Sequence, residues 1–208
     1  MSRPLVAVID DHESVRRSLT RLLSSAGYTV VTYESAVAYL EAPAPAAPSC
    51  LVLDVRMPGL TGTDLQAKLA EDGRREPVIF ITAHGDVPMC AAAMKAGAVD
   101  FLQKPFTSDA LLAAVSRALA VASEQAAANQ TARSASERLA KLTGKEMEVF
   151  RLLISGLLNK QVGAVLGTAE KTIKNHRAHI TAKLGMHSIA AMAQLAREAG
   201  VTPALPPA

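Results

Sequence analysis

Residues 51–59 read LVLDVRMPG, an apolar run that stops at Asp54 and leads into a Pro-Gly pair. A short apolar run bounded by turn residues indicates a buried strand, and Pro-Gly marks a turn. We therefore expect a strand at residues 51–53 that ends at Asp54. The spacing of apolar residues after the turn predicts a helix near residues 62–71.

The same alternation of strand and helix continues on both sides of this segment. Apolar runs predict the other strands, and apolar residues spaced three and four apart predict the helices between them. The expected strands are residues 5–9, 28–33, 51–53, 78–81 and 99–102, and the expected helices are 13–26, 35–41, 62–71, 87–96 and a last one after Phe106. Five strands alternating with five helices predict an α/β fold with a doubly wound parallel five-stranded sheet.

Five polar residues lie at or just after the ends of these strands: Asp10, Asp11, Asp54, Thr82 and Lys104. In a doubly wound sheet, ligands bind beyond the carboxyl ends of the strands, so we expect these side chains to share one site. Acidic residues at strand ends are otherwise solvated loop residues. Their combination with Thr82 and Lys104 is what favours a site.

The residue types in this group suit phosphoryl chemistry. Three carboxylates in one site repel one another unless a cation lies among them, and carboxylate oxygens with space left for water and phosphate suit Mg²⁺. With that charge neutralised, an oxygen of Asp54 could attack a phosphoryl group. The metal, Lys104 and the Thr82 hydroxyl would then hold the transferred oxygens.

The segments around these residues resemble the receiver domain of NarL/FixJ-type response regulators, over roughly residues 4–120. The matching segments are VIDD at 8–11, LDVRMPG at 53–59, ITAHG at 81–85, and KAGA through KPF between 95 and 106. The resemblance implies a flavodoxin-like fold in which Asp54 accepts a phosphoryl group from a sensor histidine kinase. His12 departs from the family pattern, because many relatives have a third Asp or Glu there. We interpret His12 as a helix cap rather than a residue that tunes the site.

The resemblance also implies roles for the other residues. The ligands of Mg²⁺ would be Asp10 (partly through water), Asp11, Asp54 and the main-chain carbonyl of Arg56. Thr82 would move toward the phosphoryl group, and Phe101 would follow it. Lys104 would bind phosphate, and a cis peptide bond between Lys104 and Pro105 would let the lysine point into the site.

The last third of the chain has a different pattern. Helices are expected near residues 144–155, after an N-cap at Asn159, at about 170–184 and near 188–199, with a tight turn at Gly167. Two helices joined by a glycine turn, the second rich in bases, indicate a helix-turn-helix. Side chains from the first half of the second helix would enter the major groove of DNA and read base edges.

Residues 139–200 resemble a LuxR-type DNA-binding domain. The matching segments include NKQV at 159–162, LG at 166–167, KTIKNHR at 171–177 and KLG at 183–185. The expected DNA contacts are Lys160, Lys171, Thr172, Lys174, Asn175, Arg177 and Lys183. Of these, Lys174, Asn175 and Arg177 would reach bases, and the others would contact phosphates. In the family, the last helix serves dimerisation; plain core packing is the other role we expect for it.

Charge separates the two halves of the chain. Residues 1–120 contain 11 Lys and Arg against 13 Asp and Glu, whereas residues 121–208 contain 11 against 6. The basic half suggests a polyanionic partner, and we expect double-stranded promoter DNA. We place the receiver at residues 4–120, a helical linker at 121–138 and a small all-α helix-turn-helix domain at 139–200.

Composition excludes several other classes. Cys50 and Cys90 are isolated, have no metal-type spacing and fit a reducing compartment. No apolar stretch is long enough to span a bilayer, and no Walker A or GxGxxG pattern occurs. We expect a cytoplasmic protein with no membrane partner.

The leading hypothesis is a phosphorylation-dependent transcription regulator that forms a homodimer when phosphorylated. One alternative is a Mg²⁺-dependent phosphohydrolase with an aspartyl-phosphate intermediate. Such enzymes need Asp-x-Asp at the nucleophile, and this chain has Arg56 where the second Asp would stand. The other alternative is a receiver that is never phosphorylated and only mediates dimerisation, against which the presence of Thr82 and Lys104 counts. We therefore expect a regulator and not an enzyme, with either dimerisation or release of an inhibitory contact coupling its domains.

Overall fold

The computed structural model describes residues 3–43, 49–83 and 87–204. The chain divides into two compact units, residues 1–126 and 127–208. His84 and Gly85, which belong to one of the segments that resemble a receiver, lie outside the described residues.

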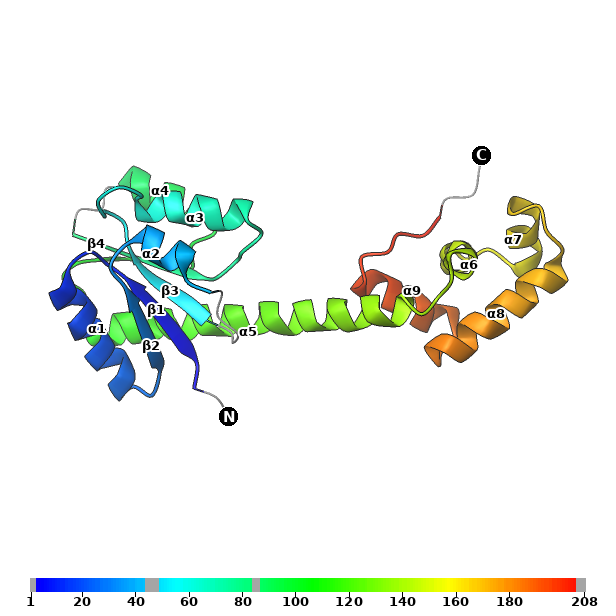
Figure 1. The fold of residues 1–208 in the computed structure, drawn as a ribbon, viewed down its shortest axis with the longest axis horizontal. Helices are drawn as coiled ribbons and strands as arrows, with labels where there is room; N and C mark the ends of the chain where they lie inside the picture. The colour runs from blue at the N-terminus through cyan, green and yellow to red at the C-terminus, as the bar shows by residue number, and fades with distance from the viewer. Residues whose placement is uncertain (1–2, 44–48, 84–86, 205–208) are drawn as a thin grey trace. The chain divides into compact units, whose positions relative to one another are not determined.

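The first unit contains a parallel five-stranded sheet with the strand order β2-β1-β3-β4-β5 (Figure 1). Its strands are β1 (Leu5–Ile9), β2 (Thr29–Tyr33), β3 (Ser49–Asp54), β4 (Val78–Thr82) and β5 (Asp100–Gln103). Its helices are α1 (Glu13–Ser25), α2 (Ala36–Glu41), α3 (Gly62–Glu71), α4 (Val87–Lys95) and α5 (Ser108–Leu139). The doubly wound α/β fold is confirmed, and the order of the strands reverses between β1 and β3.

Apolar side chains pack on both faces of this sheet. Along β1, Ala7 and Ile9 belong to one core layer, and Val6 and Val8 belong to the other. Residues of α2, α3 and α4 complete the first layer, and residues of α1 and α5 complete the second (Figure 1). Strands covered on both faces have near-continuous apolar sequences, which is why the strands could be found as apolar runs.

Gly62 fixes the path of the chain just after β3. Its amide donates a hydrogen bond to the carbonyl of Val55 at 3.0 Å. A Cβ atom at this position would overlap the main-chain oxygen of Asp54, so no larger residue fits without a shift of the backbone. The next turn is held by a capping box between Thr61 and Asp64 at the start of α3. The backbone that carries Asp54 is therefore packed directly against α3.

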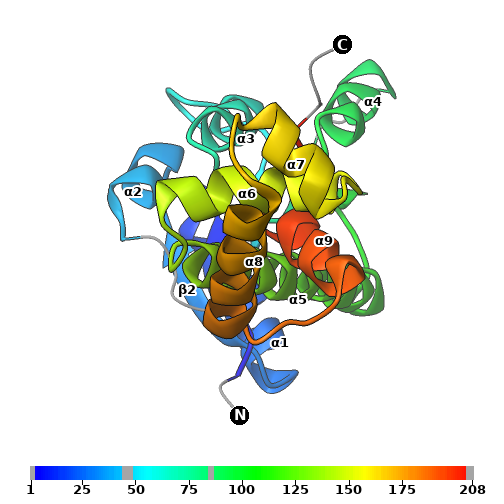
Figure 2. The ribbon, with the colours of Figure 1, turned by 90° about the vertical axis from the view of Figure 1, so that its right-hand side faces the viewer.

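The second unit is all helical. It contains α6 (Gly144–Ile154), α7 (Asn159–Val165), α8 (Glu170–Leu184) and α9 (Ile189–Glu198), together with the end of α5 (Figure 2). Its core is formed mainly by Ala135, Leu139, Phe150, Leu153, Val162, Ile173, Ile180, Leu184, Met192 and Leu195. The expected small all-α domain and the helical character of residues 121–138 are both confirmed, whereas the exact domain boundaries stay a prediction.

The expectation that Asn159 is the N-cap of α7 is wrong. Leu158 occupies the N-cap position, and Asn159 is the first residue of the helix. The reason lies at Gln161, whose side-chain oxygen accepts a hydrogen bond from the amide of Leu158 at 2.8 Å. The helix start is stabilised from inside the first turn, so a polar side chain at the N-cap is not required.

Candidate functional site

The carboxyl ends of the strands bring the expected residues to one edge of the sheet. Strand pairing keeps its register up to that edge, with Asp54 beside Ile81 and Thr82 beside Gln103. One residue beyond β5, the amide of Lys104 donates to the carbonyl of Thr82 at 2.7 Å. The parallel register therefore places the ends of β3, β4 and β5 side by side.

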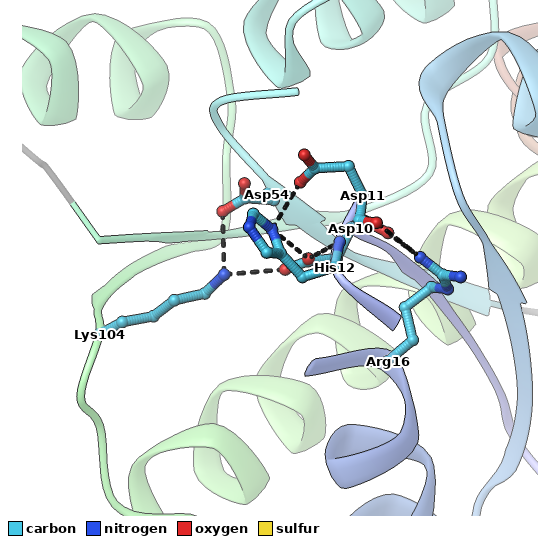
Figure 3. A network of polar contacts seen from close by, with 6 residues as sticks. All are labelled: Asp10, Asp11, His12, Arg16, Asp54 and Lys104. Carbon is cyan, nitrogen blue, oxygen red and sulfur yellow. Dashed lines mark hydrogen bonds and ion pairs between the residues drawn. The ribbon is translucent and has the colours of Figure 1, made fainter. Parts of the chain in front are cut away.

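The ammonium group of Lys104 joins two carboxylates at this edge (Figure 3). Its Nζ lies 2.8 Å from Oδ2 of Asp10 and 3.1 Å from Oδ1 of Asp54. Both acids are buried, with Asp10 fully covered and Asp54 5% exposed. The peptide bond between Lys104 and Pro105 is cis, as the resemblance to receivers implied.

Burial and charge shift the protonation equilibria of this group in opposite directions. Burial raises the pKa of the Asp54 carboxyl, and the carboxylates of Asp10 and Asp11 raise it further, while Lys104 opposes the rise without cancelling it. Burial alone would lower the pKa of Lys104, but its hydrogen bonds and ion pairs with Asp10 and Asp54 prevail, and the pKa is raised. An added cation would favour the anionic form of Asp54.

Side chains that could ligate such a cation lie close together. Ligand atoms of Asp10, Asp11 and His12 all fall within 4.8 Å of one another. The carboxylate of Asp11 is about a quarter exposed, so the cluster can be reached from solvent. Hard divalent cations prefer carboxylate oxygens as ligands and retain some of their water. A buried Asp10 beside a partly exposed Asp11 provides both carboxylate oxygens and access for water. This acidic cluster is typical of a Mg²⁺ site, and the residues present fit it.

Two neighbours of the cluster have distinct positions. His12 is the N-cap residue of α1 as expected, and its Nδ1 lies 2.9 Å from Oδ1 of Asp11 while its amide donates to Oδ1 of Asp10 at 2.8 Å. Arg56 lies two residues after Asp54 in the loop that follows β3, with its side chain exposed. Only the main chain of Arg56 enters the expected ligand set, and an exposed side chain is consistent with that.

Thr82 is the last residue of β4, and Phe101 is the second residue of β5. The Thr82 side chain is almost fully buried, at 1% exposure. The Phe101 side chain is half-buried in the core layer under α2, α3 and α4, and its ring centroid lies 6.4 Å from that of Phe80. A rotation of Phe101 would therefore change the surface beside β5.

In the second unit, α7 and α8 form a helix-turn-helix (Figure 2). The turn contains Gly167, whose φ of +63° lies in the left-handed region that favours glycine. A Cβ atom at Gly163 would overlap the carbonyl of Thr168, so the close packing of α7 against the turn also requires glycine. Ile173, Ile180 and Leu184 anchor one face of α8 in the core.

The opposite face of α8 carries exposed polar and basic side chains. Lys171, Thr172, Lys174 and Asn175 are exposed, as is Lys160 on α7. Lys174 pairs with Glu170 at 3.0 Å, one turn earlier on the same exposed face. Nη1 of the half-buried Arg177 lies 3.5 Å from Oδ1 of Asn159. Six of the seven expected DNA contacts therefore lie on α8, and Lys160 lies on the preceding helix.

Lys183 differs from the other bases of α8. Its Nζ lies 2.6 Å from Oε2 of Glu146, whose side chain is 6% exposed. The same oxygen of Glu146 accepts a hydrogen bond from the amide of Thr143 at 2.8 Å, which closes the capping box of α6. The hydrogen bond with Lys183 and those with Thr143 lower the pKa of Glu146 to about 2. The ion pair thus connects the end of α8 to the beginning of α6.

Comparison with known proteins assigns both units. Residues 6–116 match the family described as response regulator receiver domain, and residues 140–196 match the bacterial regulatory proteins of the luxR family. The transcriptional regulatory protein FixJ of Azorhizobium caulinodans is 41% identical over 199 residues, covering 96% of this chain and 94% of that protein. The chain belongs to the FixJ/NarL family of response regulators.

Further relatives cover this response regulator almost completely. Nodulation protein W of Bradyrhizobium diazoefficiens is 43% identical over 201 residues, which is 97% of this chain and 88% of that protein. Among solved structures, response regulator StyR shares 45% identity with a TM-score of 0.80, covering 95% of this chain and all of that one. Full-length FixJ from B. japonicum shares 38% identity with a TM-score of 0.58, covering 96% and 98%.

The family assignment settles the class of function. The response regulator is a two-component transcription regulator with a LuxR-type DNA-binding domain, and not an enzyme such as the phosphohydrolase considered above. A receiver implies a kinase as partner, and a LuxR-type helix-turn-helix implies DNA binding. Among the helices that the structure describes, none is long and apolar enough to cross a membrane.

Sequence reasoning overlooked two side chains of this response regulator. Arg16, on α1, donates to the main-chain carbonyls of Asp10 and Asp11, which follow β1. Glu146 holds Lys183 across 37 residues of sequence. A signal existed for part of the second role, because Thr143 and Glu146 have the spacing of a capping box. The contacts of Arg16 with carbonyls have no residue-type signal, because any main chain offers the same acceptor.

Proposed function

We propose that this regulator is cytoplasmic, that Asp54 is its phosphoacceptor and that a sensor histidine kinase supplies the phosphoryl group. The observation that carries the proposal is the bridge from Lys104 to Asp10 and Asp54 at the carboxyl edge of the sheet. A fixed ammonium beside a buried carboxylate is suited to hold the charge that a phosphoryl group brings to that carboxylate. The receiver alternative that is never phosphorylated gives no role to this arrangement.

The proposed step is a transfer between two protein side chains. A carboxylate oxygen of Asp54 forms a bond to phosphorus, the P–N bond of the kinase phosphohistidine breaks, and the departing imidazole nitrogen takes up a proton. Lys104 exchanges its contact with the Asp54 oxygen for one with a phosphoryl oxygen, and the Thr82 hydroxyl donates to another. Asp10, Asp11, Asp54 and the carbonyl of Arg56 would bind Mg²⁺, which neutralises charge on the attacking and transferred oxygens.

The test is labelling by a small phosphodonor. Wild-type protein incubated with acetyl phosphate and Mg²⁺ should gain the mass of one phosphoryl group, and Asp54→Asn should gain none because an amide is a poor nucleophile. Asp72→Asn is the matched control, since Asp72 is an exposed carboxylate at the end of α3. Undiminished labelling of the Asp54 variant would place the phosphosite elsewhere.

We propose that α8 enters the major groove of double-stranded promoter DNA. Lys174, Asn175 and Arg177 would contact bases, and Lys160, Lys171 and Thr172 would contact phosphates. Lys183 stays in the proposed set, but its ammonium must leave Glu146 before it can contact a phosphate fully, so we expect it to contribute least. The domain limits proposed with this assignment are 4–120, 121–138 and 139–200.

We propose further that phosphorylation is coupled to DNA binding by homodimerisation through α4 and β5. A phosphoryl group on Asp54 would draw the Thr82 hydroxyl inward and allow Phe101 to turn, which changes that surface. Two tethered DNA-binding domains then gain affinity for paired half-sites. The shift is limited by the difference in affinity of the phosphoryl group for the two receiver states.

Thr82→Ala separates these steps. The variant should still accept phosphate, but it should form fewer dimers than wild type when both are activated with beryllofluoride and followed by sedimentation velocity. A wild-type protein that stays monomeric when activated, yet binds its operator more tightly, would favour release of an inhibitory contact between the domains instead.

A further inference from the structure

The loop between β1 and α1 leaves three consecutive carbonyls outside the sheet. Pairing of β1 with its neighbours ends at Ile9, and α1 begins at Glu13. Asp10, Asp11 and His12 lie between them, so their carbonyls need partners other than the strand ladder. Two of these three residues are the acids that we propose as metal ligands.

The Arg16 side chain donates to two of these three carbonyls. Its Nη1 donates to the carbonyl of Asp10 at 2.8 Å and to that of Asp11 at 3.1 Å. The carbonyl of His12 is bonded within the first turn of α1 instead, where the amides of Val15 and Arg16 each donate to it at 3.1 Å. The neighbouring Arg17 is different, because its exposed guanidinium pairs with Glu13 on the surface of α1. One side chain of α1 thus fixes the direction of two peptide groups in the loop, those of the two acids.

The carbonyls and the carboxylates of this loop face different partners. In Figure 3, the guanidinium of Arg16 lies at one side of Asp10 and Asp11, and Lys104 and Asp54 lie at the other. Oδ1 of Asp10 is also held from within the loop by the amide of His12. Holding the carbonyls on one side leaves each Asp few directions for its Cα–Cβ bond, and these directions lead to the cluster.

We propose that Arg16 is a positioning residue for the cation site, acting through the main chain of Asp10 and Asp11. The inference rests on the proposed Mg²⁺ site and adds a residue that would not touch the metal. Groups that orient metal ligands in this way affect metal affinity by about 10–100-fold when they are removed. Because Arg16 acts through the main chain and two ligands remain in place, we expect the lower end of that range.

Charge and positioning make opposite predictions for Arg16. A guanidinium near a cation site repels the cation, so an effect of charge alone means that neutralising Arg16 would tighten Mg²⁺ binding. An effect of positioning means that the same change would weaken it. The sign of the change therefore distinguishes the two roles.

The experiment is a Mg²⁺ titration of the full, unphosphorylated chain, followed through the amide NMR signals of residues 54–56. Arg16→Gln should bind Mg²⁺ about tenfold more weakly than wild type. Arg17→Gln removes the same charge from the next position of the helix, and its Mg²⁺ affinity should be unchanged or slightly higher. Arg16→Lys, whose ammonium can still donate to these carbonyls but lacks the fork of the guanidinium, should lie between wild type and Arg16→Gln.

Wild-type or tighter binding by Arg16→Gln would overturn the proposal, and so would equal losses in Arg16→Gln and Arg17→Gln. If Arg16→Gln is too unstable to titrate, Arg16→Lys carries the test: affinity about threefold weaker than wild type supports positioning, and unchanged affinity overturns it. A wild-type chain that binds no Mg²⁺ would instead refute the proposed metal site. The assignment of Asp54 as phosphoacceptor is tested separately, by the labelling experiment.

Discussion

Lys104 in the receiver and Lys171 on α8 carry the same charge in opposite surroundings. Lys104 is 22% exposed and lies within hydrogen-bond distance of two buried carboxylates, whereas Lys171 is exposed on the outer face of its helix. Lys104 is held in one place by the two carboxylates that it bridges. The exposed lysine keeps its hydration and is available to a polyanion from solution.

Lys183 lies between these two cases. It belongs to the basic helix by sequence, but its ammonium pairs with the buried carboxylate of Glu146. Two lysines twelve positions apart on one helix therefore have different partners. The partner of Lys183 is a carboxylate of the same chain, and the partner proposed for Lys171 is DNA. The comparison shows that the use of a positive charge is decided by its neighbours in space, and the following predictions test that difference.

The largest effect should come from Lys104→Met, which leaves two buried carboxylates without their cation. Removing one partner of a buried ion pair costs about 3–5 kcal/mol, and we expect about 3 kcal/mol here because Lys104 is partly exposed. Urea unfolding measures this, with Lys95→Met at the exposed end of α4 as control. Added Mg²⁺ should stabilise the variant more than wild type. Equal losses of unfolding free energy in the two variants would show that the contacts of Lys104 with Asp10 and Asp54 do not stabilise the fold.

Arg177→Ala should lower operator affinity by about 1–3 kcal/mol and relax the preference for one base pair, if Arg177 reads a base edge. Its contact with Asn159 is long, at 3.5 Å, so little binding within the protein competes with the DNA. Competition with operators mutated one position at a time gives both quantities. Affinity equal to wild type on every operator would show that Arg177 reads no base, and the same result for Lys174→Ala as well would remove α8 as the reading helix.

Lys171→Met and Lys183→Met form a matched pair for the smaller contribution of phosphate contacts. Lys171→Met should weaken binding on all sequences and reduce the slope of log affinity against log salt by about one. Lys183→Met should change that slope less, because its ammonium is engaged by Glu146. Fluorescence anisotropy over a salt series decides the matter, and a larger slope change for Lys183 would contradict the proposed order.

The last prediction concerns the acid stability of the second unit. The pKa of Glu146 is lowered in the folded protein from 4.5 to about 2. The contribution of the Glu146 carboxylate to the free energy of unfolding of the second unit is therefore present above pH 4.5 and is lost as the pH falls from 4.5 toward 2. Urea unfolding of wild type, followed through NMR signals of α6, should show the free energy of unfolding of the second unit falling over this pH interval. For Glu146→Gln, that free energy should depend less on pH in the same interval. An identical dependence in both proteins would assign acid sensitivity to other carboxylates.

Much of the receiver could be predicted because its candidate site residues lie directly at the ends of apolar strands. Apolar runs ending at Asp54 or Thr82 locate both the strand and the site residue, and parallel pairing then brings the ends together. β3 starts earlier than expected, at Ser49, and β3 and β4 each end one residue later, but Asp54 and Thr82 still lie at the carboxyl edge. The fold and the site therefore came from one pattern.

Contacts made across the fold were not predictable in the same way. The sequence pattern around Lys183 predicts a phosphate contact. Only the packing of α8 against α6 shows that the carboxylate of Glu146 is within reach of its ammonium. Arg16 and Arg17 are indistinguishable by residue type, yet one reaches the main chain of the loop and the other faces solvent. Local patterns identify what a side chain could do, and its neighbours in the fold determine which of these it does.

Gly62 and Gly163 have a consequence for any method that finds functional residues by their intolerance to change. A complete mutational scan should allow glycine alone at both positions, since added Cβ atoms would overlap the oxygens of Asp54 and Thr168. Such a scan would rank Gly62 beside Asp54 itself, although hydrogen is its whole side chain and it offers no group for chemistry. A map of invariant positions in this protein would thus mix two kinds of residue, those that react or bind and those that make room for them.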